Sequence, residues 1–88
     1  MVSKTMTIIN AEGFHMRPAS MFVNEMAKFK SEITIEGGGK TANGKSIMTL
    51  IAGGFKAGTQ IEVKCEGEDE EAMLAKAAEL IESGLGEA

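Results

Sequence analysis

The chain has 88 residues, a net charge of −4 at pH 7, one cysteine and no tryptophan or tyrosine. This length suits one small domain, and we find neither an apolar run long enough to span a bilayer nor the pattern of a secretory signal peptide. The single cysteine, Cys65, excludes an internal disulfide and a Cys-x-x-Cys metal pair. We therefore expect one domain over residues 1–88, a monomer in the cytoplasm, with no metal, no cofactor and no membrane insertion.

The charges are distributed unevenly along the chain. Residues 1–45 carry a net charge of +2, whereas residues 46–88 carry −6. A nucleic-acid-binding domain would need a strongly basic face, often with aromatic side chains for stacking, so direct nucleic-acid binding is disfavoured. The mildly positive first half would instead allow an acidic protein partner to dock there.

The first half of the chain predicts a strand, a helix and a hairpin. Alternation of apolar and polar residues predicts a strand over 3–9, and the segment 11–13, which contains Gly13, interrupts this pattern. A helix is predicted over 16–28, because its apolar residues fall on one face at helical spacing: Ala19, Phe22, Val23, Met26 and Ala27. Residues 32–36 alternate with Ile33 and Ile35 on one side, and the glycines 37–39 connect this strand to a short partner over 40–43.

The second half predicts a short helix, a strand and a long helix. Ser46 is a candidate N-cap for the short helix, which Gly53 and Gly54 would end. Residues 60–65 alternate as a strand in which Cys65 is expected to be buried. Residues 68–84 predict a helix with acidic residues in its first turn and an apolar stripe through Met73, Ala77, Leu80 and Ile81, ended by Gly84.

The predicted order is β-α-β-β-α-β-α. It indicates an α+β fold, a two-layer open-faced sandwich in which three helices cover one face of a four-stranded antiparallel sheet.

The segment "GFHMRPA", residues 13–19, holds the chain's one histidine and its one proline. Gly13 allows a tight turn, His15 falls at a predicted helix start, and Pro18 lies in the first turn, where a missing N–H costs little. The free N–H groups of that turn and the guanidinium of Arg17 would form an anion site beside the imidazole. A histidine nitrogen can accept and release a phosphoryl group, and nearby cations stabilise the charge in transit. A histidine at a helix start is, however, more often a cap or a surface residue.

The pattern is specific enough to suggest a family. The chain resembles HPr, the histidine-containing phosphocarrier family of the bacterial phosphoenolpyruvate-dependent sugar phosphotransferase system. The resemblance lies in its length, its predicted element order, "GFHMRPA" around His15 and "NGKSIMTLIAGG" around Ser46. The resemblance implies that His15 accepts a phosphoryl group on Nδ1 from phospho-Enzyme I and passes it to sugar-specific Enzyme IIA. It also implies that Arg17 binds the phosphate. Met16 departs from the small residue usual in the family, and the presence of His15 argues against the related regulator Crh, which lacks that histidine.

Ser46 has both a structural and a regulatory interpretation. As an N-cap it would stabilise its helix by about 1 kcal/mol. The resemblance implies a second role, because in low-GC Gram-positive members the matching serine is phosphorylated by an HPr kinase/phosphorylase that uses ATP. Such phosphorylation connects the family with carbon catabolite control through a transcription factor. The "GKSIM" context and the "SGLGE" ending favour a Gram-positive-type protein, although enteric members carry the serine without the kinase.

The short second helix is unusually apolar, which raises the question of what its side chains contact. An exposed apolar patch around His15 would be a docking surface, and methionine suits a surface that fits several partners. The resemblance favours this interpretation for Met16, Ser20, Ile47, Met48 and Ile51, although burial in the core remains an equal alternative for Met48 and Ile51.

Two other functions remain open. The chain could be a regulatory binding module that acts through phosphorylated Ser46 and does not need His15. It could also belong to the nitrogen-related branch, with the same chemistry and different partners.

Overall fold

In the computed structural model, which describes residues 1–86, the elements follow the predicted order. They are β1 (Val2–Thr7), α1 (Met16–Met26), β2 (Glu32–Gly37), β3 (Lys40–Asn43), α2 (Ile47–Ala52), β4 (Gln60–Glu66) and α3 (Glu70–Glu82).

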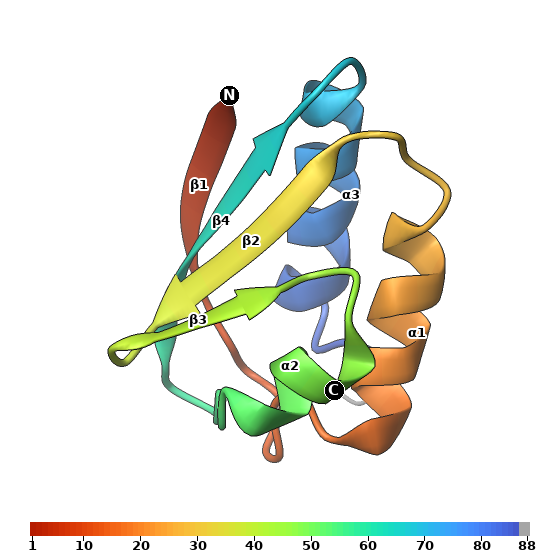
Figure 1. The fold of residues 1–88 in the computed structure, drawn as a ribbon. Coiled ribbons are helices and arrows are strands. Elements are labelled where there is room, and N and C mark those ends of the chain that lie inside the picture. Colours follow the sequence, from red (N-terminus) through yellow and green to blue (C-terminus); the bar gives the residue numbers. More distant parts are fainter. Residues whose placement is uncertain (87–88) are drawn as a thin grey trace.

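The four strands form one antiparallel sheet in the order β1-β4-β2-β3. Helices α1 and α3 lie side by side over one face of this sheet, and the short α2 lies next to α1 and the end of β3 (Figure 1). The predicted two-layer α+β sandwich is therefore confirmed. Strand β4 pairs with β1 on one side and with β2 on the other. The first strand is therefore connected to the β2-β3 hairpin through a strand that comes late in the sequence.

The strands form where apolar and polar residues alternate, and the apolar set faces the helices. Ile33 and Ile35 of β2 pair with Cys65 and Val63 of β4, and all four side chains are buried. Burial, followed by the charge of Glu70, raises the pKa of the Cys65 thiol to about 11. The prediction of a buried, unreactive thiol is consistent with this position.

Helix α1 ends two residues earlier than predicted. The N–H groups of Lys28 and Phe29 donate to carbonyls only three residues back, so the chain tightens after Met26 and leaves the helix. Ala27 was expected on the apolar face but is exposed, because it is the C-cap. The first strand is also shorter than predicted: it ends at Thr7.

Helix α3 covers Glu70–Glu82, within the predicted range of 68–84, and Asp69 is its N-cap. Gly84 ends it as expected, with a φ of 89°. The N–H of Leu85 donates to Leu80 O at 2.8 Å and that of Gly84 to Ile81 O at 3.1 Å, which is a Schellman motif.

Side chains from both layers meet in a single core. The largest fully buried side chains include Ile8, Phe22, Met26, Ile33, Ile35, Leu50, Ile61, Val63, Met73 and Ile81.

None of the helices within residues 1–86 is long and apolar enough to cross a membrane.

Candidate functional site

His15 is the N-cap of α1, as the sequence predicted. Its backbone is extended, with φ −90° and ψ −173°, and its carbonyl accepts the N–H of Ala19 at 2.9 Å. Met16 and Arg17 are the first two helical residues, so their N–H groups have no carbonyl partner within the helix. Pro18 is the third helical residue and has no N–H to leave unsatisfied. The imidazole is therefore attached at the positive end of the α1 dipole.

The loop that carries His15 depends on a close approach at Gly13. Gly13 has a φ of +59°, and a Cβ placed on it would lie 1.7 Å from the carbonyl oxygen of Phe55. The buried side chain of Asn10 donates from Nδ2 to Gly13 O at 2.8 Å, and Gly13 N donates to Asn10 O at 3.2 Å. These contacts fix the position from which the chain enters α1.

An aromatic cluster supports the same loop from inside. The Phe14 ring meets the Phe22 ring edge-on, with centroids 5.2 Å apart, and the Phe55 ring at 6.3 Å. Phe14 and Phe55 are almost completely buried and Phe22 completely. Because Phe14 precedes His15 directly, packing of one residue sets the position of the next. Sequence reasoning missed Asn10, Phe14 and Phe55, since none of them belongs to a periodic pattern.

A shallow groove runs from His15 along α1. His15 is half-buried in it and Arg17 is exposed. Four of the predicted site residues line it, together with three that were not predicted: His15, Met16, Arg17, Ser20, Met21, Asn24 and Glu25. The helical spacing of 16, 17, 20, 21 and 24 could have indicated this face.

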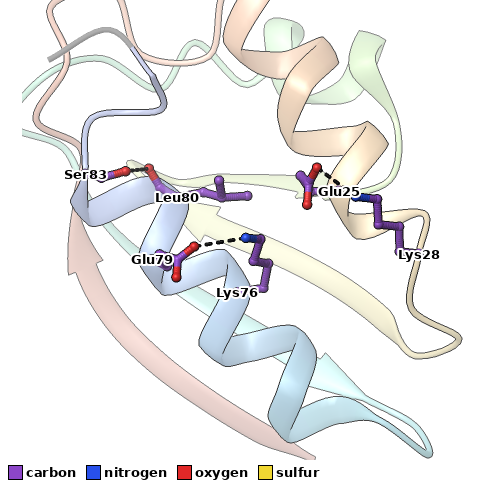
Figure 2. A network of polar contacts seen from close by, with 6 residues as sticks. All are labelled: Glu25, Lys28, Lys76, Glu79, Leu80 and Ser83. Carbon is purple, nitrogen blue, oxygen red and sulfur yellow. Dashed lines mark hydrogen bonds and ion pairs between the residues drawn. The ribbon is translucent and has the colours of Figure 1, made fainter.

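Glu25 ends the groove, and its charge is paired. Lys28, which lies just after the end of α1, donates from Nζ to Glu25 Oε2 at 3.1 Å (Figure 2). On α3, Lys76 makes the equivalent contact with Glu79 at 2.9 Å. The pKa of Lys76 is raised, chiefly by the Glu79 hydrogen bond and charge and to a smaller extent by the charge of Glu25. Among the residues that line the groove, the Lys or Arg side chain is that of Arg17, two positions after His15.

Ser46 is the N-cap of α2, which confirms its structural role. Its Oγ accepts the N–H of Thr49 at 3.3 Å. Thr49 also fixes the preceding turn, because its Oγ1 donates to Asn43 O at 3.0 Å and accepts the N–H of Asn43 at 3.1 Å. The N–H of Lys45 donates to Asn43 Oδ1 at 2.9 Å. Ser46 is half-buried and held in a defined turn.

The five residues expected at the docking surface differ in exposure. Met16 is 64% and Met48 72% exposed, so Met48 does not belong to the core. Ile47 and Ile51 are half-buried and pack against the core from α2, and Ser20 is half-buried. Helices α1 and α2 are in contact, so the exposed Met16 and Met48 lie on adjoining elements (Figure 1). We call Met16, Ser20, Ile47, Met48 and Ile51 the α1/α2 surface.

Comparisons with known proteins bear on the family and the fold of the chain. The chain matches a family model described as "PTS HPr component phosphorylation site" over residues 2–83. It is 45% identical to the phosphocarrier protein HPr of Borreliella burgdorferi, over 94% of this chain and 96% of that protein. A crystal structure of HPr-C-His from Thermoanaerobacter tengcongensis superposes with a TM-score of 0.93 at 40% identity, covering 100% of this chain and 99% of the other.

Some relatives are much longer. The multiphosphoryl transfer protein of Salmonella typhimurium is 40% identical over 98% of this chain, but the chain spans only 24% of that protein's length. The match with the family model and with a full-length relative of the same size nevertheless decides the classification. The chain belongs to the HPr family of the phosphotransferase system.

Proposed function

We propose that this chain is a phosphocarrier that accepts a phosphoryl group from phospho-Enzyme I on Nδ1 of His15. The observation that carries the proposal is the location of His15 at the N-cap of α1, in one groove with the exposed Arg17. Membership of the HPr family supports the same conclusion. The carrier then passes the phosphoryl group to sugar-specific Enzyme IIA and is regenerated unchanged.

The transfer needs a nucleophile and a site for three phosphoryl oxygens. The Nδ1 lone pair attacks phosphorus while the bond between phosphorus and the donor breaks, and the bonding electron pair leaves with the donor. The negative charge resides on the phosphoryl oxygens. These oxygens would accept hydrogen bonds from the backbone N–H groups of Met16 and Arg17 and from the Arg17 guanidinium. Reversal of the step with a second acceptor discharges the carrier, because the P–N bond is labile. One histidine is sufficient for both half-reactions.

Partners would dock on the α1/α2 surface next to His15. Met16 and Met48 are both exposed, and their side chains offer flexible apolar contacts that can fit surfaces of different shape. This property suits a carrier that must meet a donor and several acceptors in turn.

We also propose that Ser46 is a regulatory phosphorylation site, linked to carbon catabolite control through an HPr kinase/phosphorylase and a transcription factor. Ser46 lies at the start of α2, where a phosphate would be tolerated by the helix. Its charge of about −2 would instead affect an acidic partner that docks on the α1/α2 surface.

Acceptance of the phosphoryl group can be tested directly. The purified chain is incubated with phosphoenolpyruvate and Enzyme I, and we expect an acid-labile, alkali-stable phosphate that maps to His15. The His15→Ala variant should take up no label. Label of the same stability on that variant would show that the site assignment is wrong. Incubation of the native chain with Enzyme I from the nitrogen-related branch separates the two possible donors.

The alternative function, a regulatory binding module, makes a different prediction. It requires ATP-dependent phosphorylation of Ser46 and a partner complex that survives replacement of His15. Phosphoryl acceptance from Enzyme I by the native chain, lost in His15→Ala, would exclude regulation as the sole function.

A further inference from the structure

We propose that Met16 and Met48 form an oxidation-sensitive site, at which peroxides convert the thioethers to sulfoxides and weaken partner docking. This inference rests on the proposed function only for its consequence. The selectivity of the modification follows from the structure alone.

The methionines of this chain differ in exposure, and Met21, which also lines the groove, is half-buried and lies between the two extremes. Met16 and Met48 are 64% and 72% exposed, whereas Met6, Met26 and Met73 are between 0% and 4% exposed. Oxidation requires contact between the sulfur and the oxidant, so the buried group is protected as long as the fold is intact. Met1 is 71% exposed, but it directly precedes β1 and is not part of the α1/α2 surface.

The chemistry is a two-electron transfer of oxygen. A lone pair on the thioether sulfur attacks one oxygen of hydrogen peroxide, the O–O bond breaks and an S–O bond forms. The sulfur is oxidised to the sulfoxide, and the peroxide is reduced to water. The buried Cys65 does not compete for the oxidant, because its pKa of about 11 keeps it protonated and its side chain is inaccessible.

The location of the two thioethers gives the modification its effect. Met16 follows His15 directly and lines the same groove, and Met48 lies on the first turn of the adjoining helix α2. A sulfoxide is polar, so an apolar contact with a partner becomes a contact in which the new S=O dipole must be desolvated. The imidazole and Arg17 are not altered. Oxidation should therefore raise the KM for the carrier in phosphoryl transfer without a comparable change in kcat.

Peptide mapping by mass spectrometry tests the selectivity. The folded native chain is treated with hydrogen peroxide, and sulfoxide should form at Met16 and Met48 well before it forms at Met6, Met26 or Met73. Unfolding in urea should abolish the difference. Equal rates at all positions in the folded chain would overturn the proposal before any function is measured.

Kinetics with Enzyme I test the consequence. Peroxide treatment of the native chain should raise the KM for the carrier by about tenfold, and methionine sulfoxide reductase should restore it. The control is the double variant Met16→Leu, Met48→Leu, compared with its own untreated form whatever the substitutions do to the rate. Its KM should change less than about twofold on treatment, although Met1 is still oxidised.

The outcomes are distinguishable. An unchanged KM for the fully oxidised native chain contradicts the proposed docking effect. A KM that rises equally in the double variant assigns the effect to another residue. If the untreated native chain accepts no phosphoryl group, the proposed function is wrong. The selectivity of oxidation is still tested separately by the peptide mapping.

Discussion

Ser31 and Asp69, 38 positions apart, hydrogen-bond to each other in both directions. Ser31 Oγ donates to Asp69 Oδ1 at 2.5 Å and accepts the N–H of Asp69 at 3.1 Å. The backbone N–H groups of Lys30 and Ser31 also donate to the carboxylate, each at 2.9 Å. This cluster joins the start of α3 to the loop between α1 and β2. The hydrogen bond from Ser31, followed by the one from Lys30 N, lowers the pKa of Asp69 from 3.8 to about 2.

This lowered pKa predicts acid-dependent stability. The carboxylate is favoured by folding, so its contribution is complete above the ordinary pKa of 3.8 and is lost as the pH falls through about 2. The variant Asp69→Asn should be less stable than the native chain at neutral pH, and the difference should shrink as the pH falls through this range. Urea unfolding at a series of pH values measures it. A difference that does not depend on pH would show that the carboxylate charge is not involved.

We predict that any side chain at position 13 destabilises the fold. Gly13→Ala should lower the free energy of unfolding by at least ~2 kcal/mol, because it adds a backbone clash with Phe55 to the cost of a positive φ. Gly38→Ala is the matched control: its φ is +56°, but nothing lies within 4 Å of the added Cβ. Equal losses in the two variants would indicate that the approach to Phe55 is not limiting.

Arg17 should affect phosphoryl transfer and not folding. Its side chain is exposed, so Arg17→Ala should change stability by less than ~0.5 kcal/mol while it lowers the rate of phosphoryl acceptance by about 10²-fold. Rapid-quench measurement with labelled phosphoenolpyruvate and Enzyme I gives the rate. Lys40→Ala removes an exposed charge from β3 and should leave the rate within about twofold. If both variants lowered the rate of phosphoryl acceptance by similar factors, Arg17 would act through the net charge of the chain and not through binding of the phosphoryl group.

Ser46 separates a capping effect from a charge effect. Ser46→Ala removes the acceptor for Thr49 N and should destabilise the chain by about 1 kcal/mol, with little effect on transfer. Ser46→Asp keeps an acceptor at the N-cap and adds a negative charge, so stability should be preserved while the KM with Enzyme I rises. Thermal unfolding and steady-state kinetics measure the two effects. An unchanged KM in Ser46→Asp would contradict the proposed regulation.

Periodicity and helix-end residues together predicted the order of the elements, and the motif around His15 predicted its place at a helix start. Alternation marks β2 and β4 because one side of each strand is buried, and Gly84 and Ser46 have the local chemistry of helix ends. These signals are local, which is why a single sequence contains them.

The contacts that hold the site in place were not predictable in the same way. The hydrogen bond from Asn10 to Gly13 O and the approach of Phe55 to Gly13 depend on loops meeting in three dimensions. The early end of α1 follows from three-residue hydrogen bonds after Met26, where the apolar pattern still continued through Ala27. The division of α2 into the exposed Met48 and the buried Leu50 also needed the structure, because both residues are apolar.

The most direct test of a carrier is a chase of its phosphoryl group. The chain is labelled from phosphoenolpyruvate and Enzyme I, purified in its phosphorylated form, and mixed with Enzyme IIA in the absence of any other donor. We predict that label leaves His15 and appears on Enzyme IIA in equal amount, and that the recovered chain can be labelled again. Label that remains on the chain, or that is lost to water as inorganic phosphate without reaching Enzyme IIA, would contradict the assignment as a phosphocarrier.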